Sequence, residues 1–165
     1  MLTQTTETAY RVLISLALRE DAEPVSPREL AARLNASPTY MAKITGLLVK
    51  ANILRTRKGS QGGVSLAAAP GEITLLSIVE ACQGKVLGDY CDGVGKAEDT
   101  CAYHQAMLEL HDAITQTLMR WTVADLARKP GPSPVLQGKV NCKMACACRS
   151  ASQRGGHPTR SSGEN

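Results

Sequence analysis

Two cysteines and a histidine in the middle of the chain have side chains and a spacing that could hold a metal. Cys91, Cys101 and His104 form the pattern C-x9-C-x2-H. Thiolate and imidazole groups bind zinc, copper and iron-sulfur centres. Loops also carry unconnected cysteines, and a single His is commonly a polar surface residue. The pattern therefore defines a candidate metal site whose function depends on the elements around it.

The composition restricts where such a site could operate. The chain has 165 residues, which suits one domain with a single core, and it has six cysteines. It contains no apolar run of about eighteen residues and begins without a signal-peptide pattern, so we expect a cytoplasmic protein with no membrane partner. In a reducing compartment, cysteines serve as metal ligands, redox-active thiols or inert thiols rather than as a disulfide framework.

Apolar residues recur at helical spacing in three stretches before the motif. They predict helices over residues 7–18, 26–34 and 37–51, the last two opened by Ser26 and Ser37 in capping patterns. The second and third helices are short and joined by a tight turn, and basic residues follow in the third. This arrangement is typical of a helix-turn-helix, which reads DNA.

A β-hairpin is predicted after the third helix. Residues 53–57 and 64–66 have strand composition and flank the glycine-containing loop KGSQGG. Residues 43–58 hold five basic side chains and no acidic one. A basic hairpin beside a helix-turn-helix is a wing, and it favours nucleic-acid binding over an ordinary helical bundle.

Charge is segregated along the chain, although the formal net charge is only +4. Residues 1–66 carry nine Lys or Arg against five Asp or Glu, residues 67–127 carry three against nine, and residues 128–165 carry seven against one. The basic front suits a polyanionic partner, and the acidic middle does not. The chain has no nucleophile–base pair, phosphate-binding loop or paired-carboxylate pattern, so we expect no enzyme activity.

Two further helices are predicted around the candidate metal site. One is a short apolar helix over residues 73–81, and the other is a long helix over residues 101–122. The long helix carries an apolar stripe that needs a partner surface, which favours a homodimer over packing within one chain. The stripe consists of Met107, Leu108, Ile114, Leu118 and Trp121.

The predicted fold is mainly α: a winged helix-turn-helix with a small β-hairpin wing and a long C-terminal dimerisation helix. From residue 129 onward Pro, Gly, Ser and Arg dominate, which predicts a disordered, basic tail that holds Cys142, Cys146 and Cys148. The expected organisation is a DNA-binding domain over residues 1–69, a short helix and cysteine-containing sensor loop over residues 70–100, a dimerisation helix over residues 101–128 and the tail over residues 129–165.

Three stretches resemble the winged-helix iron-sulfur transcription regulator family that includes IscR and NsrR. They are LTQTTETAYRVLISLAL, then SPTYMAKITGLLVKANILRTRKGSQGGVSLA, and the C…C-x2-H block leading into VADLA. Together they cover residues 1–127, and the wing form K-G-x-x-G-G-x-x-L is their most specific part. The resemblance implies a homodimeric repressor on palindromic promoter DNA, in which an iron-sulfur cluster senses nitric oxide, redox state or iron-sulfur status.

The resemblance also implies which residues contact DNA. Thr39, Tyr40 and Lys43 match the exposed front of the recognition helix, from which family members read bases. Lys58 matches a wing residue, usually Arg, that reaches the minor groove. Ala42 replaces a base-reading Glu of IscR-type members, so their operator sequence does not transfer. The candidate DNA-binding residues are Arg28, Ser37, Thr39, Tyr40, Lys43, Arg57 and Lys58.

For the cluster, the resemblance implies a set of four ligands. His104 matches the C-x2-H ligand of the IscR type, and Glu7 matches the position from which nitric-oxide and redox sensors supply a carboxylate across the subunit boundary. Family members commonly carry three cysteines in the loop, whereas this loop holds only Cys91 and Cys101. Two thiolates, one imidazole and one carboxylate favour a [2Fe-2S] cluster over a [4Fe-4S] cluster.

Other interpretations of the cysteines stay open. Cys82 could replace Glu7 as the fourth ligand, although a buried Cys on an apolar helix commonly behaves as a small hydrophobe. Without a cluster, Cys91 and Cys101 could form a reversible disulfide, or bind zinc with His104, in a transcription regulator of another kind. A redox protein with no regulatory role is a third hypothesis, and the basic wing argues against it.

Overall fold

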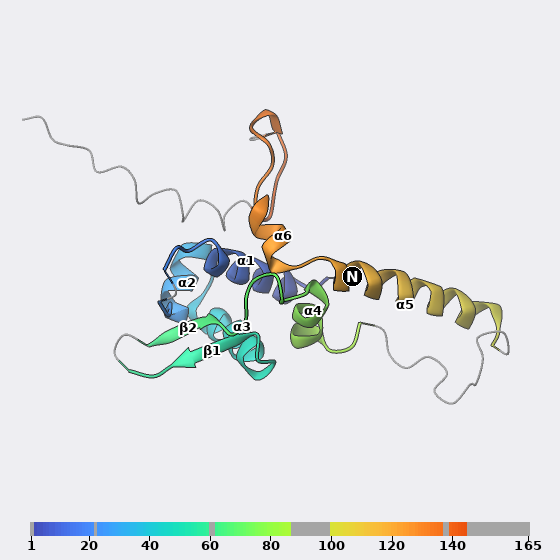
Figure 1. The fold of residues 1–165 in the computed structure, drawn as a ribbon, viewed down its shortest axis with the longest axis horizontal. Helices are drawn as coiled ribbons and strands as arrows, with labels where there is room; N and C mark the ends of the chain where they lie inside the picture. Colours follow the sequence, from blue (N-terminus) through green and yellow to red (C-terminus); the bar gives the residue numbers. More distant parts are fainter. Residues whose placement is uncertain (1, 22, 60–61, 87–99, 137–138, 145–165) are drawn as a thin grey trace, which may run out of the picture.

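The computed structural model of the chain has a helical body, a two-stranded hairpin and a long helix that leaves the body (Figure 1). The structure describes residues 2–21, 23–59, 62–86, 100–136 and 139–144. The predicted fold class, mainly α with a winged helix-turn-helix, is confirmed. Within the described ranges, no helix is both long and apolar enough to span a bilayer.

Three helices form the first part of the body. They are α1 (Gln4–Ala17), α2 (Pro27–Leu34) and α3 (Pro38–Lys50). Helix α1 begins three residues before its predicted start because the Thr3 hydroxyl accepts a hydrogen bond from the Thr6 amide at 3.3 Å. Such a cap satisfies one of the amides that have no partner within the helix.

The helix-turn-helix is built by local capping, as its sequence predicts. The hydroxyl of Ser26 accepts from the Glu29 amide at 3.1 Å, and the hydroxyl of Ser37 accepts from the Tyr40 amide at 3.2 Å. Between the two helices, Asn35 adopts a left-handed conformation with φ of 52°, which Asn tolerates better than most residues. The turn brings the inward faces of α2 and α3 together over α1. The largest fully buried side chains of these helices are Val12, Leu13, Ile14, Leu30, Leu34, Met41, Ile44 and Leu48.

The wing consists of antiparallel strands β1 (Leu54–Arg57) and β2 (Gly63–Leu66). Val25, from the segment before α2, adds a third short extended piece, because its amide and carbonyl each bond to Val64 at 2.9 Å. A Cβ atom on Gly63 would lie only 2.5 Å from the carbonyl of Val25. The glycine in the wing motif is therefore required by the close approach of these two backbones.

The second part of the body contains α4 (Leu75–Gln83) and α6 (Val123–Arg128). Helix α6 begins with a reciprocal capping box, in which the Asp125 amide donates to the Thr122 hydroxyl and the Thr122 amide donates to the Asp125 carboxylate. The amide of Leu75 donates to the carbonyl of Trp121 at 2.9 Å. The last bond joins the start of α4 to the segment that precedes α6.

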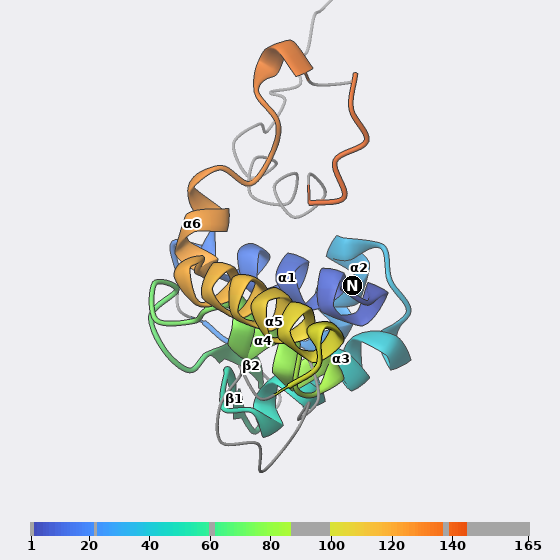
Figure 2. The same cartoon turned by 90° about the vertical axis from the view of Figure 1, so that its right-hand side faces the viewer.

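Helix α5 (Ala102–Arg120) projects from the body as an arm (Figure 1). Its C-terminal end lies beside α4 and α6, and its N-terminal end forms the distant tip; Figure 2 views the arm from that tip. No residue of α5 is buried. Four of the five predicted stripe residues are half-buried, whereas Trp121 is 45% exposed. Other large apolar side chains on the arm are also exposed: Tyr103, Leu110 and Met119.

The predicted tail is described over residues 129–136 and 139–144, and it includes the short 3-10 helix η2 (Pro134–Leu136). The sequence predicts disorder from residue 129 onward, and that expectation stays a prediction. Met144 packs against the core, and Lys143 forms an ion pair with Glu7 on α1. Contacts between residues this far apart in the chain cannot be recognised from local composition.

Candidate DNA interface and candidate metal centre

The outward side of α3 is the candidate DNA-reading face. Thr39 and Lys43, both predicted contacts, are exposed there, and they alternate at helical spacing with the buried residues of the core. Gly46 and Lys50 continue the same face at steps of three and four residues and are also exposed. Lys50 is not among the predicted contacts, and its spacing from Lys43 places it on the same face of α3.

Two predicted DNA contacts at the start of α3 also hold the fold together. Ser37 caps the helix through its hydroxyl. Tyr40 is half-buried rather than exposed as expected, because its ring packs against the core and its hydroxyl donates to Thr5 Oγ1 at 3.4 Å. A hydroxyl tied to α1 is less free to read a base, so Tyr40 acts first as a bridge between α1 and the recognition helix.

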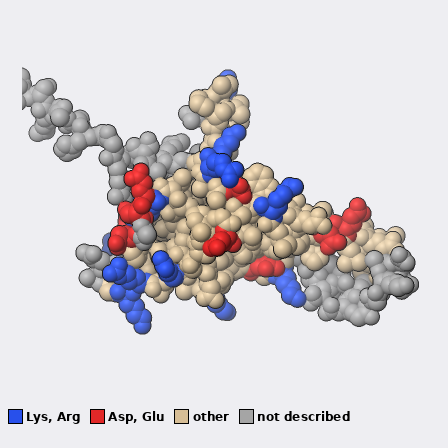
Figure 3. All heavy atoms as spheres, in the orientation of Figure 1, with Lys and Arg blue, Asp and Glu red and all other residues tan. Residues whose placement is uncertain are grey.

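The wing and α2 present the remaining predicted contacts at the surface. Arg28, Arg57 and Lys58 are exposed. A guanidinium nitrogen of Arg57 lies 3.6 Å from the Glu23 carboxylate, and because both side chains are about 70% exposed, this pair is weak and easily exchanged for a phosphate. Basic side chains gather over the hairpin at the lower left of Figure 3, with acidic side chains above them.

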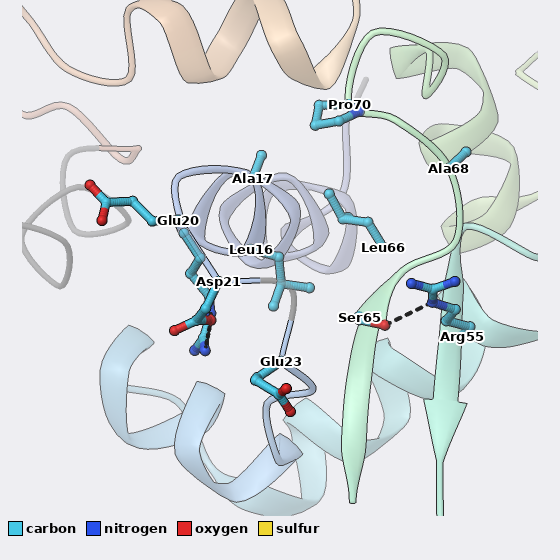
Figure 4. Close-up of a pocket in the computed structure, with 11 residues that line it drawn as sticks. Leu16, Ala17, Glu20, Asp21, Glu23, Arg55, Ser65, Leu66, Ala68 and Pro70 are labelled. Carbon is cyan, nitrogen blue, oxygen red and sulfur yellow. Dashed lines mark hydrogen bonds and ion pairs between the residues drawn. The ribbon is translucent and has the colours of Figure 1, made fainter.

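A pocket between the C-terminal end of α1 and the hairpin has a different character (Figure 4). One wall is apolar and includes Leu66, and acidic side chains, among them Glu20 and Glu23, line the other side. Between the strands, Arg55 Nε donates to Ser65 Oγ at 3.1 Å. Arg19 and Arg55 also line the pocket, so with three carboxylates it has no excess of positive charge that would attract a polyanion.

Cys101 and His104 meet at the tip of the arm. Cys101 is the N-cap residue of α5, and its Sγ atom lies 2.9 Å from Nδ1 of His104. The backbone amide and the imidazole of His104 lower the pKa of the exposed Cys101 thiol. A thiol at a helix N-terminus beside an imidazole is the environment that favours thiolate, the form that binds metal.

The donor chemistry of this pair fits an iron-sulfur or zinc centre. In a tetrahedral site, a cysteine sulfur and a histidine nitrogen on one metal lie about 3.6 Å apart, so the pair would open by only a fraction of an ångström. Among the described residues, no three His, Cys, Asp or Glu side chains lie close enough together to hold one metal ion. The predicted ligand Cys91 lies outside the described residues. Cys101 and His104 are therefore two candidate ligands that the structure places together.

Glu7 does not join this pair within one chain. It lies on α1 in the body, whereas the arm tip points away from the body (Figure 1). Its side chain is 28% exposed, and its carboxylate accepts from Lys143 Nζ at 2.9 Å through each oxygen. The structure thus separates Glu7 from the two other described ligand candidates of its own chain.

Cys82 has the environment of a packing residue. It is half-buried on α4 and packs against the core. Burial raises the pKa of its thiol, and a hydrogen bond with Thr6 only partly opposes that rise. Burial likewise raises the pKa of the neighbouring Tyr10 hydroxyl to about 12. A thiol held neutral in this way is a poor metal ligand, which supports the core-packing interpretation.

Comparison with known proteins agrees with these features. Residues 2–129 match the family model of Rrf2, described as an iron-dependent transcriptional regulator. The regulator NsrR of Geobacillus kaustophilus is 30% identical over 129 residues, which cover 76% of this chain and 88% of that protein. The transcriptional repressor NsrR of Streptomyces coelicolor is 29% identical over 140 residues, covering 83% and 94%.

A solved structure shares the fold. It is CymR, the global cysteine regulator of Bacillus subtilis, with a TM-score of 0.64 and 22% identity over 78% of this chain and 96% of CymR. The relatives are helix-turn-helix transcriptional regulators, which confirms the expectation that this chain is not an enzyme. Because the family match spans most of the chain, the protein belongs to the Rrf2 family and is a DNA-binding transcriptional regulator.

Proposed function

We propose that this regulator binds palindromic promoter DNA as a homodimer and represses transcription under the control of a [2Fe-2S] cluster. The observation that carries the proposal is the pairing of Cys101 with His104 at the tip of an arm that points away from Glu7 of the same chain. The iron-dependent description of the family and the two NsrR relatives support a cluster that responds to nitric oxide, redox state or iron-sulfur status.

DNA recognition is assigned to the exposed side of α3 and to the wing. Thr39 and Lys43 would reach base edges in the major groove, while Lys58 would enter the adjacent minor groove. Arg28 and Arg57 would contact phosphates, Arg57 after it leaves Glu23. Ser37 and Tyr40 would contribute through the position that they give to α3.

The arm supplies the dimer interface in this proposal. A helix of 19 residues is about 28 Å long, and no residue of α5 is buried. Its exposed apolar residues, Tyr103, Leu110 and Met119, need a partner surface. In a two-fold symmetric pair the same face serves both chains, and each arm carries its tip toward the body of the other chain.

The cluster would be held by Cys91, Cys101 and His104 of one chain and by Glu7 of the other. When bound, it supplies an inorganic centre that oxidants or nitric oxide can destroy. The lowered pKa of the Cys101 thiol favours its thiolate form, and helix α5 holds His104 beside it. A link between the tip of one chain and α1 of the other would hold the two α3 helices at one spacing, which sets operator affinity.

The decisive test uses mixed dimers purified without oxygen. A Cys101→Ser chain is paired with a Glu7→Gln chain, and iron and acid-labile sulfide are measured per dimer. If Glu7 acts across the subunit boundary, one of the two sites stays intact and the mixed dimer holds half of the wild-type iron. If ligands came from a single chain, both sites would be broken and the iron would be lost. A Cys82→Ala chain is the matched control and should keep its iron.

DNA selected from a random pool by the wild-type protein provides the operator for a second measurement. Affinity is compared with the cluster present and after its removal by a chelator. We expect a large loss of affinity on removal for the wild type. Equal affinity in both states would contradict control by the cluster, but it would not contradict the assignment of the DNA-binding residues.

A second candidate function follows from the reactivity of Cys101. A thiol whose pKa is lowered reacts readily with oxidants, so a reversible disulfide with Cys91, or a zinc site with His104, could control DNA binding without a cluster. Metal analysis separates the candidates. Iron with sulfide supports the cluster, zinc supports the second site, and metal-free protein whose DNA affinity depends on thiol reductant supports the disulfide.

A further inference from the structure

The C-terminal segment of the chain contacts the candidate ligand Glu7. Lys143 Nζ donates to both carboxylate oxygens at 2.9 Å. Met144 packs against the core, and Cys142 is half-buried. Three amides of this segment, those of Lys139, Val140 and Cys142, donate to backbone carbonyls. The match to the family model covers residues 2–129, so Glu7 lies inside it and Lys143 lies beyond it.

The surface around Glu7 suits such a basic segment. Leu2, Gln4, Glu7, Thr8, Arg11 and Lys143 line one pocket on the N-terminal side of α1. Arg11 is held away from Glu7 by its own bond, since its guanidinium donates to the Leu34 carbonyl at 2.6 Å. The carboxylate of Glu7 therefore faces the tail, and residues 128–165 carry seven basic residues against one acid. Opposite charges bring the two together.

We propose that residues 139–144 dock on this face of α1 and compete with the iron-sulfur cluster for Glu7. The inference rests on the ligand role of Glu7 in the proposed function. An ammonium nitrogen 2.9 Å from both carboxylate oxygens occupies the position between them, and its positive charge opposes a metal cation at the same carboxylate. When the cluster binds, Glu7 exchanges its ammonium partner for iron, and no electrons are transferred. The segment thus favours the cluster-free state.

The size of the effect follows from the exposure of the pair. The Lys143 side chain is 66% exposed and that of Glu7 is 28% exposed. Exposed ion pairs of this kind shift an equilibrium by no more than about five-fold. The segment would therefore tune cluster occupancy when iron is scarce, and it would not prevent cluster binding when iron is abundant.

Docking is tested first, in the full cluster-free protein, by hydrogen exchange of residues 139–144. Glu7→Gln removes the acceptor charge and should speed exchange in this segment. Glu80→Gln, at an exposed acid on α4, is the matched control and should change nothing. The charge swap that combines Glu7→Lys with Lys143→Glu should restore protection. Equal exchange in the wild type and Glu7→Gln would overturn the docking claim.

Competition is tested by reconstituting full-length protein with limiting iron and sulfide and recording the visible absorbance of the cluster. Lys143→Gln should raise occupancy by about two- to five-fold, Lys143→Arg should match the wild type, and Lys139→Gln controls for the loss of one positive charge. Equal occupancy in Lys143→Gln and Lys139→Gln would overturn the competition. If the wild type takes up no iron at any concentration, the proposed function itself fails, and the competition fails with it.

Discussion

Gly63 of β2 lies so close to Val25 that no side chain fits between them, since a Cβ atom would lie 2.5 Å from the Val25 carbonyl. That contact anchors the wing to the segment before α2. Gly63→Ala should therefore lower the free energy of unfolding by about 1–3 kcal/mol, the usual range for forced overpacking. Chemical denaturation measures the change. A variant as stable as the wild type would mean that the backbone can move to admit the methyl group at no cost in free energy.

Gly46 provides the opposite case. It lies on the exposed side of α3, and a Cβ atom there would meet nothing within 4 Å. Because Gly is a poor residue in a helix interior, Gly46→Ala should stabilise the protein by about 0.5–1 kcal/mol. The same methyl group would point at DNA, so affinity for the selected operator should fall. A gain in stability with unchanged affinity would mean that this part of α3 does not contact DNA.

The two arginines assigned to phosphates should act through charge. Arg28→Ala and Arg57→Ala should each weaken operator binding and reduce the slope of log affinity against log salt by about 1, because each guanidinium is assigned to one phosphate. Lys139→Gln, a charge loss in the tail, is the control and should leave the slope unchanged. A titration of fluorescent operator DNA at several salt concentrations measures the slopes. Unchanged slopes in the first two variants would contradict their assignment.

The capping box at α6 should make stability depend on pH. Hydrogen bonds from the hydroxyl and amide of Thr122, together with the nearby Arg128, lower the pKa of the Asp125 carboxyl. Because the folded pKa lies below the unfolded pKa, Asp125 stabilises the folded state above its unfolded pKa. That contribution is lost as the pH falls through the folded pKa.

Asp125→Asn isolates this contribution. The wild type should melt at a higher temperature than the variant near neutral pH, and the gap should close in acid, where the wild-type carboxyl is protonated. Thermal unfolding at a series of pH values gives the comparison. A gap that stays constant down to the acid end would assign the effect to the shape of the side chain rather than to its charge.

Local features of the structure were predictable from the sequence. The hydroxyl caps at Ser26 and Ser37, the turn between α2 and α3, and the glycine loop of the wing each depend on residues within a few positions of one another. Capping, helical periodicity and turn chemistry act over this short range, so a single sequence carries them in full. The family resemblance extended that prediction to the fold and to DNA binding.

Only the tertiary structure decided how distant residues pair. It ties Tyr40 to Thr5, joins Val25 to Val64, and brings Lys143 to Glu7 across 136 positions. It also carries Cys101 and His104 to the tip of an arm, away from the carboxylate expected to complete their site. The sequence by itself determined which side chains could bind DNA or metal. Their partners depend on how the helices pack, because contacts between distant residues follow from the packed core and not from local spacing.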